Sequence, residues 1–130
     1  MTSKIVANDS TIRPTLPSHY YWSEDIYTLE KENVFYNSWL CVGRADRIPS
    51  PGDFFVQTVA DESVIVTRGK TEKIYAFYNV CRHRGNRLCS KESGKFKGGA
   101  LACRYHGWTY SLNGELIATP NMLDTDGFLM

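Results

Sequence analysis

Two short segments that each pair a cysteine with a histidine constrain this chain more than any other feature. In CRHRG one residue separates Cys81 from His83, and in CRYHGW two residues separate Cys103 from His106. Thiolates and imidazoles are common protein ligands of zinc and iron. If these two half-sites serve one metal centre, the fold has to bring together two loops that are well separated along the chain.

Composition restricts the setting in which the half-sites act. The 130 residues suit one domain, and the chain has 42% hydrophobic residues, 22% charged residues and a formal net charge of +1. These values are typical of a soluble globular protein and indicate neither nucleic acid nor a membrane as partner. The first residues lack the apolar core of a signal peptide, so we expect a cytoplasmic location.

The chain has four cysteines, and this setting favours metal binding over disulfides. Disulfides persist in oxidising compartments, which the lack of a signal peptide argues against. Cysteines beside histidines in a reducing compartment indicate a metal site. We therefore expect Cys81 and Cys103 to be ligands, and Cys41 and Cys89 to be small buried apolar residues.

The N-terminal part of the chain has two sections. Residues 1–17 are polar and interrupted by prolines, which predicts an extended arm. Ser23 can cap a helix, and the acidic Glu24 and Asp25 suit a first helical turn. With the apolar residues that come after them at helical spacing, they predict a helix over about residues 24–37.

Three β-rich runs come next, at residues 53–60, 63–69 and 73–80. The short polar segments between them predict an antiparallel meander. The last run leads directly into Cys81, so the first half-site lies just after the end of a strand.

The region around the second half-site alternates between loop and strand. Residues 84–99 are polar and contain glycines, which predicts a loop, and residues 100–103 predict a short strand. Residues 109–118 predict a hairpin that turns at Asn113 and Gly114. The expected fold class is therefore mostly β with an N-terminal helix.

The aromatic residues and the third histidine have ordinary structural interpretations. His19 lies beside two tyrosines near the arm and is expected to be a surface or packing residue. Large aromatic side chains are expected to form the core. These are Trp22, Trp39, Phe54, Phe55 and Tyr75.

The ligand set itself leaves two kinds of metal centre open. Two cysteines and two histidines can hold a structural zinc ion tetrahedrally. Zinc modules usually take like ligands from one segment, whereas each half-site here mixes a thiol with an imidazole. Mixed pairs suit a binuclear iron cluster in which both cysteines bind one iron and both histidines bind the other.

The motif CxH followed by CxxH, in the words CRHRG and CRYHGW, resembles the Rieske domain of Rieske non-haem iron oxygenase α subunits. These are the aromatic-ring-hydroxylating and quaternary-ammonium oxygenases. The segment LPSHYYWSEDIYTLEKENVFYNSWLCVGRADRIPSPGDFF is similar to the entry into those subunits. The resemblance implies a Rieske-type antiparallel β domain over residues 18–130, including the helix, with cluster loops at residues 81–87 and 103–108.

The resemblance also implies a [2Fe–2S] cluster and a role for each nearby residue. Cys81 and Cys103 would bind one iron, and His83 and His106 the other. The residues expected to surround these ligands are Arg84, Gly85, Tyr105, Gly107 and Trp108. The glycines would let the backbone approach the cluster, and Trp108 would shield it from water.

The activity of such a subunit needs a part that this chain is expected to lack. Oxygenase α subunits hold a mononuclear Fe(II) on two histidines and a carboxylate in a C-terminal catalytic domain. With two of three histidines on the cluster, only His19 remains, so we expect no catalytic residue in this chain. The alternative is a stand-alone Rieske ferredoxin, an electron carrier.

The resemblance implies partners as well. An electron-donating ferredoxin or an NAD(P)H-dependent reductase would reduce the cluster, and a full-length form would assemble as a homotrimer. One stretch of the chain has seven basic residues and only the acidic Glu92, and we hypothesise that it docks the electron donor. The basic residues are Arg82, Arg84, Arg87, Lys91, Lys95, Lys97 and Arg104.

Overall fold

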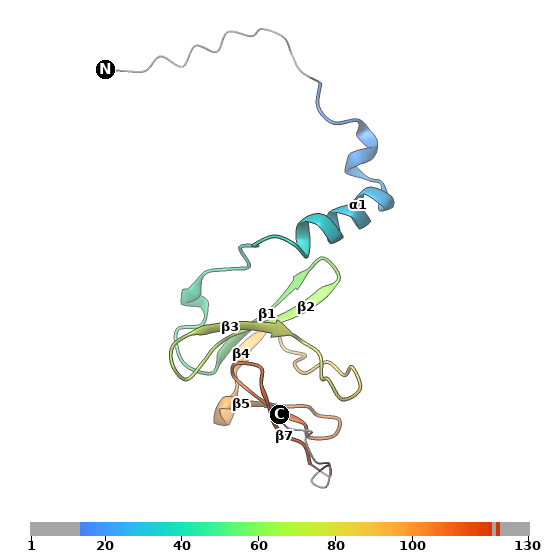
Figure 1. The fold of residues 1–130 in the computed structure, drawn as a ribbon. Helices are drawn as coiled ribbons and strands as arrows, with labels where there is room; N and C mark the ends of the chain where they lie inside the picture. Colours follow the sequence, from blue (N-terminus) through green and yellow to red (C-terminus); the bar gives the residue numbers. More distant parts are fainter. Residues whose placement is uncertain (1–13, 121, 123–130) are drawn as a thin grey trace, which may run out of the picture. The chain divides into compact units, whose positions relative to one another are not determined.

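The computed structural model describes residues 14–120 and 122 (Figure 1). The chain divides into two units, with the boundary between Ser38 and Trp39. The helix lies in the first of these units. The division into an arm, residues 1–17, and a Rieske domain, residues 18–130, stays a prediction. None of the residues in the helical segments is buried, so these segments form no core of their own. Most of the expected arm, residues 1–17, lies outside the described residues.

The described part of the first unit is mostly helical. A 3-10 turn at Ser18–Tyr21 precedes helix α1 (Glu24–Glu30), and a π-helical segment, Lys31–Phe35, continues it. The expected helix over residues 24–37 therefore begins where the acidic first turn indicates, but it changes form after Glu30. Within the described ranges, none of the helices combines the length and apolarity that crossing a bilayer requires.

The π-helical segment has a local cause. The Tyr36 N–H donates to the Lys31 carbonyl, five residues back, at 3.0 Å. The Asn33 side-chain amide donates to the Leu29 carbonyl at 2.8 Å. Asparagine side chains compete in this way for carbonyls of the preceding turn, which disfavours regular α-helix.

The second unit contains two antiparallel sheets, and the larger holds four strands. These are β1 (Asp53–Val59), β2 (Glu62–Arg68), β3 (Ile74–Tyr78) and β4 (Ser93–Lys95). Their order is β3-β2-β1-β4, and Phe55 lies opposite Val66 in the central pair. The predicted three-strand meander is confirmed.

Part of the loop predicted over residues 84–99 is instead a strand, β4. It has the sequence SGK, without β-branched or aromatic residues, and all three residues are exposed. Its strand form depends on pairing with β1, where Phe54 lies opposite Gly94. Tertiary pairing of this kind overrides weak local preference, so the sequence carries no signal for it.

The smaller sheet carries the second half-site. It consists of β5 (Ala100–Ala102), β6 (Thr109–Ser111) and β7 (Leu116–Ala118), in that order. The predicted hairpin joins β6 to β7, and Gly114 in its turn has φ of +89°. The Gly114 N–H donates to the Ser111 carbonyl at 3.0 Å.

The core of the second unit joins both sheets to both half-sites. Phe54 and Ile65 of the larger sheet and Tyr110 of the smaller one pack in one buried cluster with Cys81 and Cys103. Phe54 and Phe55 are buried, as expected, and Tyr75 is half-buried. The burial of both cysteines makes the two half-sites part of the core rather than an addition to its surface.

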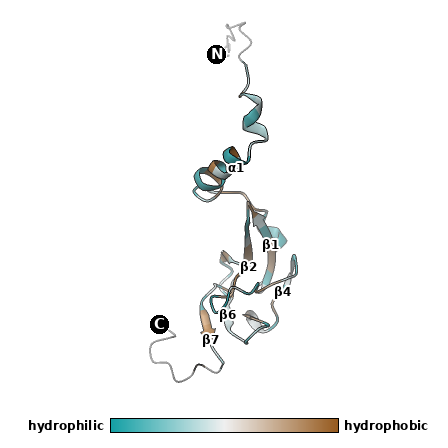
Figure 2. Cartoon of the chain, turned by 90° about the vertical axis from the view of Figure 1, so that its right-hand side faces the viewer, coloured by the Kyte–Doolittle hydropathy of each residue, from teal (hydrophilic) through white to brown (hydrophobic). Residues whose placement is uncertain are grey.

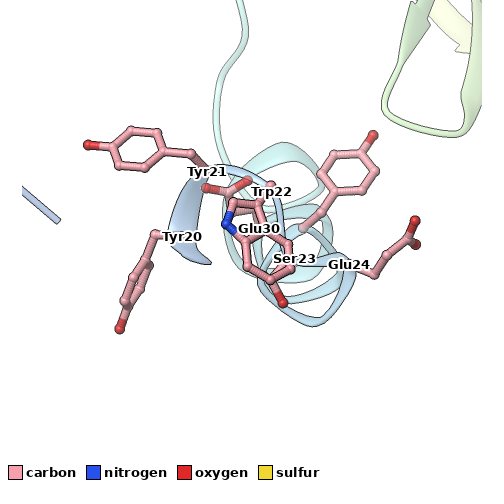
Figure 3. A pocket seen from close by; sticks show the side chains of 7 residues that line it. Tyr20, Tyr21, Trp22, Ser23, Glu24 and Glu30 are labelled. Atoms are coloured by element: carbon pink, nitrogen blue, oxygen red, sulfur yellow. The ribbon is translucent and has the colours of Figure 1, made fainter. Parts of the chain in front are cut away.

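Three residues expected to be buried are exposed. Trp22 is 74% exposed, and Trp39 and Cys41 are also exposed. Figure 2 shows hydrophobic positions interspersed with hydrophilic ones along α1, in the unit that contains Trp22, and Figure 3 shows Trp22 with the other side chains that line a pocket of this unit. Aromatic type alone does not decide burial, because burial requires an opposing surface.

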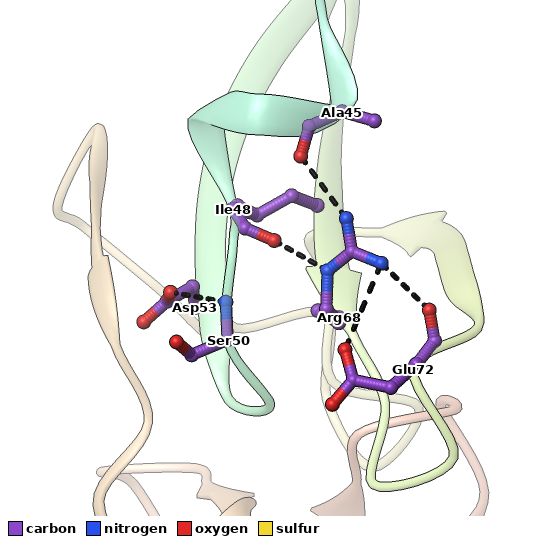
Figure 4. Close-up of polar contacts among 6 residues, drawn as sticks. All are labelled: Ala45, Ile48, Ser50, Asp53, Arg68 and Glu72. Carbon is purple, nitrogen blue, oxygen red and sulfur yellow. Dashed lines mark hydrogen bonds and ion pairs between the residues drawn. The ribbon is translucent and has the colours of Figure 1, made fainter.

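Arg68, at the end of β2, fixes the segment that enters the larger sheet (Figure 4). Its guanidinium donates to the carbonyl of Ile48, to the carbonyl of Ala45 at 3.1 Å and to the carbonyl of Glu72 at 2.7 Å. Ile48 packs against Phe55 in a second buried cluster. One side chain thus satisfies carbonyls from two loops.

Candidate metal centre

The two half-sites are loops of the same backbone design. The Cys81 N–H donates to the Asn86 carbonyl at 2.7 Å, and the Gly85 N–H donates back to the Cys81 carbonyl at 2.9 Å. The second loop repeats both bonds at the same spacings and lengths, with Cys103, Gly107 and Trp108. The two loops thus have the same backbone hydrogen bonds but different histidine positions. The histidine comes two residues after the cysteine in the first loop and three residues after it in the second.

The fifth residue of each loop requires a left-handed backbone. Gly85 has φ of +68° and Gly107 has φ of +75°. A Cβ at Gly85 would meet nothing within 4 Å, whereas one at Gly107 would lie 3.2 Å from Pro120 Cγ. Backbone conformation therefore explains both glycines, and a close approach to a cluster stays a prediction.

The four half-site side chains lie as two pairs. The side chains of Cys81 and Cys103 are buried in the same core cluster. The rings of His83 and His106 are half-buried, with centroids 4.7 Å apart. The thiol pair thus lies in the core, and the imidazole pair lies nearer to solvent. In the described residues, no three His, Cys, Asp or Glu side chains surround one point as ligands of a single ion.

One atom of the site is orphaned. His106 Nδ1 is buried and has no hydrogen-bond partner in the described chain. A buried polar atom without a partner is costly, because it has lost its hydrogen bonds to water. Coordination of a metal by this nitrogen would satisfy it, so the residues present fit a metal centre.

The pKa shifts of two half-site residues favour the protonation states that bind metals. Burial alone would raise the pKa of Cys103, but hydrogen bonds from the Tyr105 and His106 amides and from the Cys81 and Asn86 side chains lower it. Burial, followed by the neighbouring charges of His106 and Arg84, lowers the pKa of His83. A thiolate and a neutral imidazole are the ligand forms of these side chains.

Tyr110 lies against the thiol pair. Its hydroxyl accepts the Arg82 N–H at 3.0 Å and lies 3.3 Å from Cys81 Sγ. Burial and the neighbouring Cys81 raise the pKa of Tyr110 to about 12, so the hydroxyl keeps its proton. When Cys81 is a thiolate, the Tyr110 proton is the one donated in this contact.

Asn86, in the first half-site, makes a similar contact with Cys103 of the second half-site. Its side-chain amide donates to Cys103 Sγ at 3.7 Å. Neither Asn86 nor Tyr110 is among the site residues that the sequence predicts. Tyr110 was recognisable as an inward residue of β6, because it alternates with the buried Trp108 and Leu112. No pattern in the sequence indicates that Asn86 contacts the other half-site.

Aromatic rings cover both imidazoles. Trp108 is buried and stacks on His83, with a centroid distance of 4.6 Å and an interplanar angle of 10°. The centroid of the Tyr105 ring lies 3.8 Å from that of His106, but Tyr105 is 58% exposed. Trp108 thus covers one face of His83, while Tyr105 packs against His106 and keeps part of its own ring exposed.

The basic residues of the half-sites and the stretch between them are all exposed. Arg84 and Arg104 adjoin the two histidine-bearing segments, and Arg87 and Lys91 line one groove with Arg47. Lys95 pairs with Asp53 at 3.3 Å. Glu92 lines the same groove as Arg87 and Lys91, where basic side chains outnumber acidic ones.

Comparison with known proteins identifies the domain. Residues 38–128 match the family model for the Rieske [2Fe-2S] domain. The chain is 45% identical over 100 residues to the benzene 1,2-dioxygenase subunit alpha of Pseudomonas putida, covering 77% of this chain and 22% of that protein. It is 39% identical over 114 residues to the carnitine monooxygenase oxygenase subunit of Acinetobacter baumannii, covering 88% and 30%.

Solved structures agree with these relatives. The apo form of the quaternary ammonium Rieske monooxygenase CntA superposes with a TM-score of 0.81 at 38% identity, over 88% of this chain and 33% of that one. The chain spans about a quarter of the length of the curated relatives it matches. The expected mostly β Rieske fold and [2Fe–2S] cofactor are confirmed. The chain belongs to the Rieske [2Fe–2S] domain family and is related to oxygenase α subunits.

Proposed function

We propose that this chain transfers single electrons through a [2Fe–2S] cluster held by Cys81, His83, Cys103 and His106, as the Rieske part of an oxygenase. The observation that carries the proposal is the pairing of the four side chains. Two loops of equal design offer a buried pair of thiols and a half-buried pair of imidazoles. The thiols would bind one iron and the imidazoles the other, and the bound cluster supplies one-electron chemistry.

The chain's own residues have definite tasks in this function. Tyr110 and Asn86 donate hydrogen bonds to the two cysteine sulfurs and so stabilise negative charge there. Trp108 covers one face of His83, and the half-buried imidazole pair lies nearer to solvent than the buried thiol pair. The histidine side of the site is therefore where electrons would enter and leave.

The parent reaction we infer is hydroxylation of an aromatic or betaine-like substrate with dioxygen. It is supported by the names of the relatives, which include benzene dioxygenase, glycine betaine monooxygenase and carnitine monooxygenase subunits. A mononuclear iron outside this sequence would carry out the oxygen chemistry. A ferredoxin or an NAD(P)H-dependent reductase would supply the electrons, and a full-length form would be a homotrimer.

A stand-alone Rieske ferredoxin is the second candidate. It is favoured by the second unit, which forms a compact body with its own core. The first unit argues against it, because an electron carrier has no use for an exposed aromatic segment. Sequence that continues in frame beyond Met130 with the ligands of a mononuclear iron would decide for the oxygenase.

The cluster is tested by electron paramagnetic resonance of the dithionite-reduced protein, together with iron and sulfide analysis. We expect a rhombic signal with a low average g value and two irons per chain. Cys103→Ser should abolish the signal, whereas the matched control Cys89→Ser, also buried but outside the half-sites, should retain it. A colourless protein that binds one zinc ion would contradict the proposal and establish the structural zinc module.

A further inference from the structure

The two half-site loops are closed at their bases in different ways. The second loop connects the paired strands β5 and β6, and the residues that flank it, Ala102 and Thr109, lie opposite each other. The first loop follows β3, which lies at the edge of the larger sheet and pairs only with β2 in the described residues. The next strand along the chain, β4, pairs with β1 instead. Strand pairing therefore does not close the base of the first loop.

The side chain of Asn79 supplies hydrogen bonds at this base. Its Oδ1 accepts the Cys89 N–H at 2.8 Å, and its Nδ2 donates to the Cys89 carbonyl at 2.7 Å. A carboxamide has an acceptor oxygen and a donor NH2 group, so it can bond to both backbone groups of one residue. Opposite residues of antiparallel strands exchange the same pair of bonds. Asn79 thus joins the end of β3 to a residue ten positions later.

The same side chain is anchored on the larger sheet. Asn79 Nδ2 also donates to Ser63 Oγ in β2 at 3.2 Å, and the Asn79 N–H donates to the Ser63 carbonyl at 2.8 Å. Asn79 is only 4% exposed, and both polar atoms of its side chain have partners. Exchanging its oxygen and nitrogen would set donor against donor at the Cys89 N–H, so the hydrogen bonds fix the orientation of the amide.

The segment that Asn79 closes carries half of the candidate metal centre. It contains Cys81 and His83, and its Asn86 side chain donates to Cys103 Sγ of the second half-site. The position of this segment therefore affects two proposed ligands directly and a third through Asn86. A change at Asn79 would reach all three without altering any of them.

We propose that Asn79 is a positioning residue for the cluster, because its carboxamide closes the base of the first half-site loop in place of strand pairing. We call its bonds to the Cys89 backbone and to Ser63 Oγ the Asn79 bridge. The inference rests on the proposed function, since the bridge matters to electron transfer only if the loop holds a [2Fe–2S] cluster. Without the bridge, the loop opens at its base while the second loop stays closed.

Hydrogen–deuterium exchange with residue-level mass spectrometry tests the bridge in the cluster-loaded chain. The Cys89 amide lies in no helix or strand, so its protection reports the bond to Asn79 Oδ1. We expect Asn79→Ala to speed exchange of the Cys89 and Cys81 amides at least tenfold. Exchange of the Cys103 and Gly107 amides in the second loop should stay within twofold of that in the unaltered chain.

Retention of the cluster tests the consequence for the site. Iron release from the dithionite-reduced protein to bathophenanthroline disulfonate should be at least tenfold faster in Asn79→Ala. The matched control is Cys89→Ser, which changes the side chain at the other end of the bridge but keeps the N–H and C=O groups that Asn79 contacts. Both its exchange and its iron release should stay within twofold of the unaltered values.

The reduction potential distinguishes positioning from general destabilisation. Because Asn86 donates to Cys103 Sγ, displacement of the first loop weakens that bond and disfavours the reduced cluster. Asn79→Ala and Asn86→Ala should therefore each lower the potential. Their shifts should not be additive, and the double variant should fall clearly short of the sum, because both changes remove the same hydrogen bond.

Several outcomes would overturn the proposal. Equal acceleration of exchange in both loops would show that Asn79 only stabilises the fold, and additive potential shifts would show that it does not act through Asn86. A Cys89 amide that exchanges as fast in the unaltered chain as in an unstructured peptide would show that the bridge does not form, even if Asn79→Ala fails to fold. An unaltered chain that binds no cluster would instead contradict the proposed function, while its Cys89 exchange still reports the bridge.

Discussion

Tyr110 shows how much one side chain outside the motifs contributes to the site. Its hydroxyl contacts Cys81 Sγ and accepts the Arg82 N–H, so it links a cysteine to the backbone of the same loop. The burial that raises its pKa to about 12 keeps the phenol protonated at any physiological pH. It is therefore a permanent hydrogen-bond donor to a thiolate.

Tyr110→Phe removes that donor and is expected to lower the reduction potential of the cluster. A hydrogen bond to sulfur stabilises the reduced form, which carries the additional negative charge. A loss of about 1.4 kcal/mol corresponds to roughly 60 mV for a one-electron couple. Protein-film voltammetry measures the shift. Tyr105→Phe is the control, since Tyr105 is largely exposed. The reduction potential of this variant should stay close to that of the unaltered protein.

At the scale of elements, the two loops provide an internal comparison. Both close with the same pair of backbone hydrogen bonds, and both need a left-handed glycine four residues after the cysteine. They differ in what surrounds that glycine. Gly85 has open space where a Cβ would stand, and Gly107 has Pro120.

Gly107→Ala is therefore expected to destabilise the protein more than Gly85→Ala. Forcing alanine into the left-handed region costs about 1–2 kcal/mol at either position, and the contact with Pro120 adds to this at residue 107 alone. Urea unfolding of the cluster-loaded protein measures both. Gly98→Ala has the same backbone cost and an open site outside the loops, so it should destabilise without hastening cluster loss. Equal costs at residues 85 and 107 would contradict this account.

The hydrogen bonds of Arg68 also act at the scale of elements, because they hold two loops against the end of β2. Its planar guanidinium reaches three carbonyls at once, and a lysine ammonium cannot reproduce that geometry. We expect Arg68→Lys to lower the free energy of unfolding by about 2–3 kcal/mol. Arg44→Lys, at an exposed pair with Asp46, should change it by less than about 1 kcal/mol. Thermal unfolding followed by circular dichroism compares the two.

For the whole molecule, the surface charge determines which donors approach the cluster. The formal net charge is only +1, yet exposed basic residues are concentrated in and between the half-sites. A local field of this kind speeds association with an acidic protein even when the overall charge is small.

Reduction of the cluster by an acidic ferredoxin is expected to slow about tenfold as salt rises from low to physiological concentration. Stopped-flow measurement at several ionic strengths checks this. Arg87→Glu combined with Lys91→Glu should slow reduction at low salt, whereas Lys73→Glu, between β2 and β3, should have a much smaller effect. A rate without salt dependence would exclude the docking hypothesis.

Local patterns along the chain were enough to predict the meander, the hairpin over residues 109–118 and the family, while the ligand set stays a prediction. Each of these depends on residues close together in the chain: cysteine and histidine spacing, alternation along a strand, and Asn-Gly at a turn. The start of α1 was predictable for the same reason, from its acidic first turn.

Features that depend on distant residues could be seen only in the folded chain. Strand β4 exists because β1 pairs with it, and Asn86 reaches a cysteine of the other half-site. Trp22 and Trp39 are exposed because burial needs an opposing surface, and residue type does not supply one. Local patterns in the sequence thus indicate the cysteines and histidines of the candidate site, while long-range packing decides which other side chains surround them. The reason is that packing energy depends on contacts between distant residues, which a linear pattern does not encode.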